Sequence, residues 1–307
     1  MGDGPPAVVS VAPYQPWVAG AFRWRLGLRP LDLDDWIEIG DDYAEQMAAK
    51  ADARTCHPDT VLVAMDEAVA ACREVLDALV VHLVGRRPDA FAHIGGAVIN
   101  HRTGERLLLD GPLHPLDIAG RLVQEDLVVM VPVDGRLVFA AGSVCSPNRW
   151  DLRSKLGRPL AEVHAPVSRL NDQLVDPIDK ALERLTPTRS FWRLGWGLLD
   201  TPALYQPVDG TAPAPPTVVT AHDVHVRVER ETLRRFPNTA CVLFTIRTHI
   251  TRLTDVAADP EAARRLREAV AAMPDDVRDY KRLDRIDAVL AEVLADVTSR
   301  PVSPPSS

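Results

Sequence analysis

Apolar and polar positions along the chain predict both strands and helices. Two β-rich apolar runs, residues 127–133 and 136–144, are joined by Asp134-Gly135. An Asp-Gly pair between such runs is a strong hairpin signal, because its tight turn needs positive φ at both central residues. Three more strand-like runs follow the hairpin, over residues 191–199, 224–233 and 240–250. Together the five runs predict the strands of one antiparallel sheet.

Apolar positions at helical spacing predict the helices. We expect a helix of about 12–15 residues to begin at Asp34, because acidic residues in a first turn favour the helix dipole. Short apolar pieces at residues 90–100 and 105–109 predict a second hairpin around residues 101–104. The remaining helices are predicted over residues 59–84, 116–125, 171–185, 259–272 and 284–297.

The order of these elements predicts an α+β fold, a five-stranded antiparallel sheet with short helices on one face. An N-terminal arm with a helical and hairpin region should cover residues 1–115, a core residues 116–253, and C-terminal helices residues 254–298. The proline-rich loop 206–217 should be flexible, and residues 299–307 should form a disordered tail. We expect the aromatic residues of the N-terminal arm to pack on the body: Tyr14, Trp17, Phe22, Trp24 and Trp36.

Composition narrows the class of protein. The 307 residues are 46% hydrophobic and 25% charged, which is typical of a soluble globular protein. A net charge of −8 disfavours a nucleic-acid surface. No run approaches the about 20 apolar residues of a membrane span, and the N-terminus lacks a signal-peptide pattern. We therefore expect a cytoplasmic protein that binds neither nucleic acid nor membrane.

The four cysteines are scattered without a Cys-x-x-Cys pair. That spacing disfavours a zinc site or a cysteine-held iron–sulfur cluster and favours buried free thiols. The sequence also lacks the glycine-rich dinucleotide fingerprint, a P-loop and a Gly-x-Ser-x-Gly elbow. If the protein performs redox chemistry, its electrons must come from another chain.

Candidate chemistry appears where residues 222–231 alternate with period two. His225, Arg227, Glu229 and Glu231 should point to one side of a strand. This side could be a solvated face. Alternatively it lines a pocket in which Arg227 supplies fixed donors and Glu229 holds a cationic amine or relays protons. His222 and His225 fall on opposite faces and do not predict a metal site.

A single histidine, His164, lies in the sequence Glu-Val-His-Ala-Pro-Val. A histidine so close to a proline does not fit the middle of a long helix, because the residue before proline avoids the helical region. We expect His164 at a helix end or in a rigid turn. From there it could face a ligand or stabilise the fold.

Four segments, taken in order, strongly resemble the haem-dependent oxidative N-demethylase α-subunit family. They are residues 123–131, 146–167, 227–237 and 242–253. The resemblance extends from Trp17 to Leu283. It implies a PAS-like haem fold in which haem b activates O2 and oxidises a small secondary amine, dimethylamine, to a carbinolamine that yields methylamine and formaldehyde. Electrons would come from NADPH through separate reductase subunits with FMN and a [2Fe-2S] cluster.

The resemblance also implies roles for four residues. His164 would be the axial haem ligand, since imidazole is the commonest haem iron donor. Trp150 would pack near the haem cavity. Arg227 and Glu229 would be distal residues that orient the amine and stabilise oxygen on the iron.

The chain departs from the family pattern at two positions. Glu231 stands where the family has glutamine, and His249 stands where an aromatic residue often follows threonine. The first departure adds a negative charge beside the predicted pocket and could alter which amine is accepted.

Two other functions fit the same resemblance. One is a non-catalytic PAS-like haem or gas sensor, and the other is a haem-free relative that keeps only the fold. A sensor normally passes its signal to an output domain, which the C-terminal helices and tail do not resemble. This feature favours the enzyme.

Overall fold

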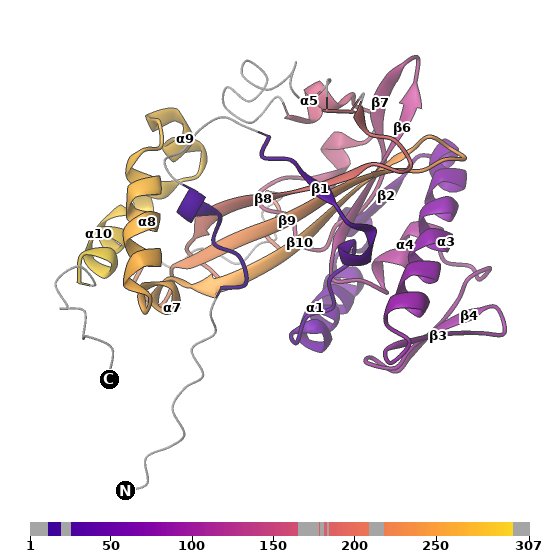
Figure 1. Cartoon of the computed structure of the whole chain (residues 1–307), viewed down its shortest axis with the longest axis horizontal. Coiled ribbons are helices and arrows are strands. Elements are labelled where there is room, and N and C mark those ends of the chain that lie inside the picture. The colour runs from indigo at the N-terminus through magenta and orange to yellow at the C-terminus, as the bar shows by residue number, and fades with distance from the viewer. Residues whose placement is uncertain are drawn as a thin grey trace, which may run out of the picture.

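A seven-stranded antiparallel sheet forms the centre of the computed structural model, in the order β1-β8-β9-β10-β6-β7-β2 (Figure 1). The structure describes residues 12–19, 26–164, 178, 181–182, 184–208 and 218–296. The strands of this sheet are β1 (Arg29–Leu31), β2 (Leu62–Ala64), β6 (Asp126–Val133), β7 (Arg136–Ser143), β8 (Ser190–Leu199), β9 (His225–Arg235) and β10 (Val242–Arg252).

The five predicted strands are confirmed as the centre of the sheet, but a total of five is wrong. Two three-residue strands complete the edges, where β1 pairs with β8 and β2 pairs with β7. Strands so short show no period of their own, so only their long-range partners define them. The predicted hairpin between β6 and β7 is confirmed, with φ of 47° at Asp134 and 77° at Gly135.

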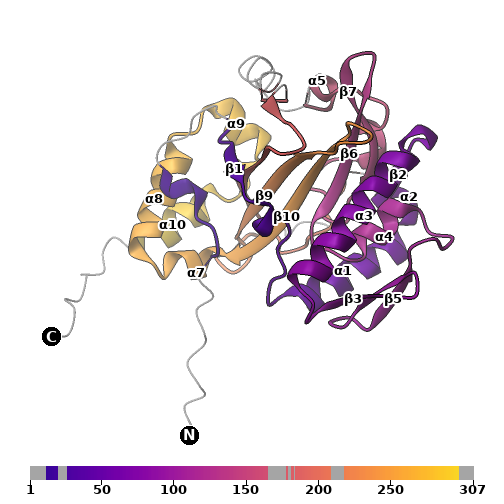
Figure 2. The ribbon, with the colours of Figure 1, turned by 45° about the vertical axis from the view of Figure 1, so that its right-hand side comes forward.

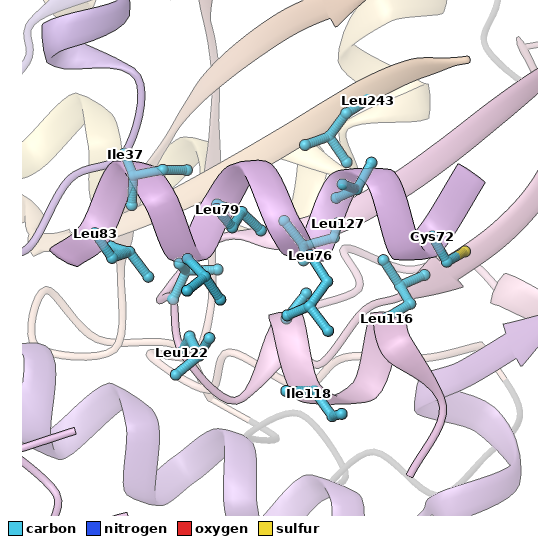
Figure 3. Close-up of a cluster of buried hydrophobic side chains, with 14 of the residues drawn as sticks. Ile37, Cys72, Leu76, Leu79, Leu83, Leu116, Ile118, Leu122, Leu127 and Leu243 are labelled. Atoms are coloured by element: carbon cyan, nitrogen blue, oxygen red, sulfur yellow. The ribbon is translucent and has the colours of Figure 1, made fainter. Parts of the chain in front are cut away.

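Helices cover one face of the sheet next to β6 and β10. They are α1 (Tyr43–Cys56), α2 (Pro58–Val61), α3 (Val69–Arg86) and α4 (Pro115–Gly120). Figure 3 shows Leu76 and Leu79 of α3 packed among Leu127 of β6 and Leu243 of β10, all of them fully buried. This apolar layer forms the largest part of the core.

Two predicted helices begin later than expected. Only a 3-10 turn, Leu33–Asp35, follows Asp32, and the 14-residue helix α1 starts at Tyr43. The helix predicted over residues 59–84 is interrupted by β2, whose Leu62 pairs with Ser143 of β7. An edge strand satisfies its backbone through a distant neighbour, so this tertiary pairing overrides the local helical pattern.

A separate three-stranded sheet comprises β3 (Phe91–Ile94), β4 (Ala97–Asn100) and β5 (Glu105–Leu108). The predicted turn at residues 101–104 is confirmed between β4 and β5. The apolar piece 90–100 contains a further hairpin, because Gly95 and Gly96 adopt φ of 57° and 72° that a two-residue turn requires.

The opposite face of the sheet is covered by the chain that follows β7. This segment contains a 3-10 turn, Leu152–Lys155, and helix α5 (Leu160–His164). Val128 and Phe244 point to it, whereas their neighbours Leu127 and Leu243 point to the α3 side. Both faces are therefore buried, and the prediction of helices on one face only is wrong.

The C-terminal helices pack at the end of β8 and β9 away from α3 (Figure 2). They are α7 (Leu253–Ala257), α8 (Pro260–Ala271), α9 (Asp275–Tyr280) and α10 (Asp287–Asp296), with a 3-10 turn at Leu283–Arg285. The two predicted helices correspond to α8 and α10. Trp17 of the N-terminal arm is 1% exposed and donates from Nε1 to the Ala262 carbonyl over 3.2 Å.

Other predictions have mixed outcomes. Trp36 is buried like Trp17, and Tyr14 is half-buried, whereas Phe22 and Trp24 lie outside the described residues. Most of the predicted helix 171–185, residues 209–217 of the proline-rich loop and the tail also lie outside them.

All four cysteines are free, but the prediction that all are buried is wrong for Cys56, which is exposed at the end of α1. Across the described ranges of the chain, no helix is both long and apolar enough to cross a bilayer.

Replacing Leu76 with alanine tests the core. Leu76 is fully buried between α3 and the sheet, so we expect Leu76→Ala to lower the free energy of unfolding by about 2–5 kcal/mol. Urea unfolding followed by circular dichroism measures it. Val81→Ala on the same helix is the control, because Val81 is 74% exposed and should change stability by less than about 0.5 kcal/mol. Equal losses for the two variants would contradict this packing.

Candidate functional site

The alternating residues of β9 lie on the face of the sheet that the segment after β7 covers. Glu229 is directly opposite Gly195 of β8 and Thr248 of β10. Residues directly opposite each other in an antiparallel pair share a face. Arg227 and Glu231 of β9 lie on this same face, opposite Gly197 and Arg193 of β8. His225, Arg227 and Glu231 are each at most 6% exposed, so the alternative of a solvated face is wrong.

Arg227 is a fully buried cation that ties three parts of the chain together. Its Nε donates to Glu229 Oε1 over 2.7 Å. Its Nη2 donates to the Ser146 carbonyl over 2.6 Å and to Thr248 Oγ1 over 3.1 Å. A guanidinium with several charge-assisted bonds has a rigid orientation, so Arg227 sets the position of the Glu229 carboxylate.

Glu229 is the more open member of the pair, with a side chain that is 22% exposed. Arg227 occupies Oε1, and no hydrogen bond reaches Oε2 from the residues that the structure describes. Tyr280 is the last residue of α9, and Lys281 follows it. Both lie close enough to the Glu229 carboxylate for its charge to shift their pKa values. Burial raises the pKa of Tyr280, and the charge of Glu229 raises it further.

Lys281, which follows helix α9, connects the C-terminal helices to strand β8. Its Nζ donates to the Trp196 carbonyl on β8 over 2.8 Å. Burial lowers the pKa of the Lys281 ammonium, and the negative charge of Glu229 opposes that effect. No local pattern in the sequence relates Tyr280 and Lys281 to β9, so neither residue was predicted.

Two glycines leave the β8 backbone bare opposite Arg227 and Glu229. A Cβ on Gly195 would lie 3.0 Å from Glu231 Oε1 and 3.7 Å from Glu229 Oε2. A Cβ on Gly197 would lie 3.7 Å from Lys281 Nζ. We call Gly195 and Gly197, together with the neighbouring side chains of Glu229, Glu231 and Lys281, the glycine ledge. The side chains of Glu231 and Glu229 already occupy the space beside Gly195, where a Cβ would be crowded.

A buried charge pair supports Arg227 from β6, which lies beyond β10 in the sheet. Asp126 accepts from the backbone N–H groups of Cys145 and Ser146 over 2.8 and 2.9 Å. Lys50 of α1 lies 4.0 Å from Asp126 and donates to the Val123 and Glu125 carbonyls. These bonds hold the turn whose Ser146 carbonyl accepts from Arg227.

Comparison with known families now adds to this geometry. The chain matches the family described as haem-dependent oxidative N-demethylase, alpha subunit-like, over residues 27–291. The chain belongs to this family.

The matched range covers the whole central sheet and the glycine ledge. It includes all four residues predicted from the family resemblance, as well as Lys281. Membership in an alpha subunit-like family implies a multi-subunit oxygenase with partner chains.

Two of the predicted residues lie on the covering segment rather than on the sheet. Trp150 is partly buried and packs against the apolar cluster that contains Val128, Phe191 and Phe244. His164 lies in α5, and the residues that follow it lie outside the described part of the chain, so its predicted place at a helix end stays a prediction. Its side chain lies outside what the structure describes.

The two departures from the family pattern lie on opposite faces of the sheet. Glu231 faces the ledge, where Arg193 donates from Nε to Oε2 over 2.5 Å and from Nη2 to Oε1 over 3.3 Å. Burial raises the pKa of Glu231, and Arg193 opposes that effect. The added negative charge therefore has a dedicated partner.

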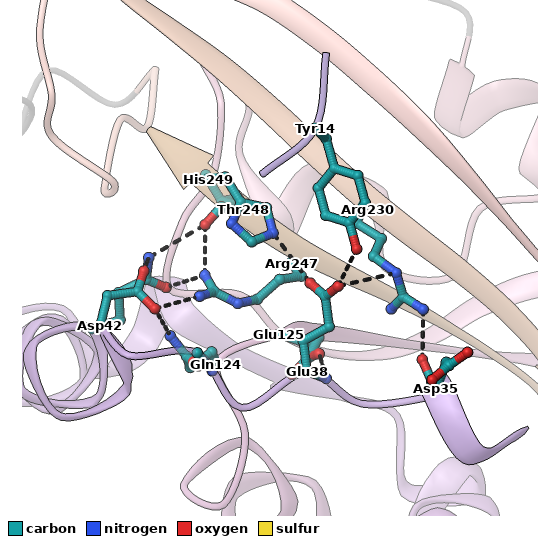
Figure 4. Close-up of polar contacts among 12 residues, drawn as sticks. Tyr14, Asp35, Glu38, Asp42, Gln124, Glu125, Arg230, Arg247, Thr248 and His249 are labelled. Carbon is teal, nitrogen blue, oxygen red and sulfur yellow. Dashed lines mark hydrogen bonds and ion pairs between the residues drawn. The ribbon is translucent and has the colours of Figure 1, made fainter. Parts of the chain in front are cut away.

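His249 lies on the α1 side, in a polar network shown in Figure 4. His249 Nε2 is 3.1 Å from Glu38 Oε2, and Tyr14 donates to the same carboxylate. Burial alone would raise the pKa of Glu38, but hydrogen bonds from His249 and Tyr14 and the charge of Arg230 lower it. This departure is therefore outside the ledge face.

Arg247 extends the same network toward the site. It donates to Asp42 Oδ1 over 2.7 Å and to Gln46 Oε1 over 2.6 Å (Figure 4). Its neighbour Thr248 points to the other face and contacts Arg227. The network thus fixes the strand that carries Thr248.

A surface groove of about 780 Å³ runs along α3 beside the β9–β10 turn. Glu74 and Arg234 are among its lining residues, and it shares none with the glycine ledge. This groove is therefore separate from the site.

The Arg193–Glu231 ion pair predicts a pH-dependent stability. We expect Arg193→Gln to lower the free energy of unfolding by about 3 kcal/mol at pH 8, because it leaves the Glu231 carboxylate buried without a cation. The pKa of Glu231 already lies above its ordinary 4.5 in the folded state. Ionised Glu231 therefore begins to destabilise the folded state above pH 4.5, and this effect grows with pH. The loss of unfolding free energy in Arg193→Gln should accordingly be smaller at pH 5 than at pH 8.

The double variant Arg193→Gln/Glu231→Gln is the matched control, because it removes both charges. It should recover most of the stability at pH 8 in urea unfolding. A double variant no more stable than Arg193→Gln would show that the buried charge is not the cause.

Proposed function

We propose that this chain is the oxygenase subunit of an enzyme that removes a methyl group from a small secondary amine, dimethylamine, with O2. The family match supports haem dependence and oxidative N-demethylation. The observation that carries the amine specificity is the Arg227–Glu229 pair, which leaves one carboxylate oxygen available in a largely buried site.

The residues around the ledge fit a haem. Trp150 and the cluster around Phe191 and Phe244 supply apolar walls on the same face of the sheet. We propose that His164 would hold the haem iron, because imidazole is the commonest haem iron donor and α5 belongs to the covering segment. When bound, haem b supplies the iron centre at which O2 is activated with electrons from outside this chain.

Glu229 binds and orients the amine. A protonated secondary amine carries one positive charge and two N–H donors, which suit a carboxylate oxygen. Arg227 holds Oε1, so Oε2 accepts the N–H of the substrate. Glu231 and Lys281 lie close to Gly195 and Gly197, so a bulky substituent on the amine would meet one of these side chains.

Glu229 also manages the substrate proton. It accepts a proton at Oε2 as the amine becomes neutral, and Arg227 stabilises the carboxylate between turnovers. The covering segments exclude bulk water from Arg227, which makes these charge-assisted bonds stronger than they would be in water.

Partner reductase subunits deliver the electrons. We propose NADPH, FMN and a [2Fe-2S] cluster in those subunits, since the chain itself has none of the sequence motifs for binding them. An acidic chain with four free cysteines is consistent with a reducing cytoplasm.

The absorption spectrum of His164→Ala tests the haem ligand. The wild-type protein should purify with a haem absorption band, and His164→Ala should lose most of its haem, because the iron loses its axial nitrogen. Pyridine haemochrome assay gives the haem content per chain. His101→Ala, an exposed histidine on the β4–β5 turn, is the control. Full haem content and an unchanged spectrum in His164→Ala would remove His164 from the site.

Glu229→Gln tests the amine site. We expect it to retain haem and to lower NADPH-linked dimethylamine oxidation by about tenfold to a hundredfold, because it removes one charge-assisted bond to the substrate. Glu292→Gln on α10 is the control, since Glu292 is exposed. Unaltered turnover in Glu229→Gln with the reductase present would mean that Glu229 does not contact the substrate.

A further inference from the structure

Three arginines lie close together where β8 ends, and two of them pair with one buried aspartate. Asp200, which is 6% exposed, accepts from Arg149 Nη2 at Oδ1 over 3.0 Å. Arg285 Nη1 lies 3.0 Å from the other oxygen, Oδ2. Arg282 is the third arginine, and it is exposed on the turn that precedes Arg285.

Arg282 adds positive charge close to the Arg149–Asp200 ion pair. Burial lowers the pKa of Arg149, and the nearby charges of Arg282 and Arg285 lower it further although Asp200 opposes them. The nearby Asp287 is engaged by Arg278 over 2.6 Å. Within the described ranges, Arg282 has no acidic partner at ion-pair distance.

The backbone presents two of the arginines in an unusual conformation. Arg149 has φ of 59° and Arg282 has φ of 54°, both in the left-handed region that side chains rarely adopt. The backbone N–H of Arg149 donates to the Gln206 carbonyl over 2.7 Å, which fixes the turn. The ion pairs of Asp200 engage Arg149 and Arg285, and Arg282 takes no part in them.

The arginines adjoin the glycine ledge through their neighbours in the chain. Lys281, directly before Arg282, bonds the Trp196 carbonyl and lies beside Gly197. Trp150, directly after Arg149, packs against the apolar cluster of the covering segment. The three arginines therefore lie at the rim of the proposed haem site.

We propose that Arg149 and Arg282, with Arg285 holding Asp200 between them, form a carboxylate site that binds the haem propionates. This inference rests on the proposed function. Propionates are the only charged groups on the porphyrin ring, and a guanidinium pairs with a carboxylate through two parallel hydrogen bonds. Positive charge at the rim compensates for moving these carboxylates out of water.

The test compares two porphyrins that differ only in these carboxylates. The full-length chain, freed of haem, is titrated by absorbance with iron protoporphyrin IX and with its dimethyl ester, which keeps the iron and the ring. Wild-type protein should bind the free acid about tenfold or more tightly than the ester, as expected for charge-assisted bonds. Arg282→Gln should weaken binding of the free acid by about tenfold and leave binding of the ester unchanged.

Arg267→Gln, an exposed arginine on α8, is the matched control and should bind both porphyrins as wild type does. Arg149→Gln should show the same selective loss as Arg282→Gln. Arg149 also pairs with Asp200, so the thermal unfolding of the Arg149→Gln variant is recorded. Arg282→Gln remains decisive if that variant is unstable.

Equal affinity of the wild-type protein for acid and ester would overturn the propionate site and leave the proposed function standing. An equal loss for both porphyrins in Arg282→Gln would also overturn it. A wild-type chain that binds neither porphyrin would contradict both this inference and the proposed function.

Discussion

The buried guanidinium of Arg227 is the contact on which the rest of this site depends. It joins β9 to β10 through Thr248, to the turn after β7 through Ser146, and to its own strand through Glu229. A charge that is 1% exposed must have these partners, because an unpaired buried cation would cost several kcal/mol. The same requirement that stabilises the fold therefore orients the carboxylate.

The sheet around Arg227 is rigid because both its faces are buried. On one side, α3 and α4 pack an apolar layer against Leu127 and Leu243. On the same side the network of Arg247, Asp42 and Glu38 connects β10 to the N-terminal segment. A strand fixed from behind in this way presents Thr248 and Glu229 with little freedom, and preorganised groups are the ones that bind and orient a substrate well.

Charge is balanced locally across the ledge face. Glu229 is paired with Arg227, Glu231 with Arg193, and Asp126 lies beside Lys50. The departure at Glu231 thus adds an ion pair, since its carboxylate is matched by an arginine on the neighbouring strand. Glutamate in place of glutamine makes the charge of this face more negative by one, and Arg193 pairs with the added carboxylate.

Elements with a strong local signal could be predicted from the amino-acid sequence. The Asp-Gly turn, the period of two along β9 and the spacing of α8 and α10 all depend on near neighbours, and the four family motifs are equally a property of the chain alone. The alternation also indicated correctly that Arg227 and Glu229 share a face. Only the tertiary structure decided that this face is buried, that β1 and β2 complete the sheet, and that the helix predicted at Asp34 begins at Tyr43. Lys281 and the three arginines around Asp200 likewise come together from distant segments. Such contacts join residues far apart in sequence, and their energies depend on burial and pairing, which no local pattern encodes.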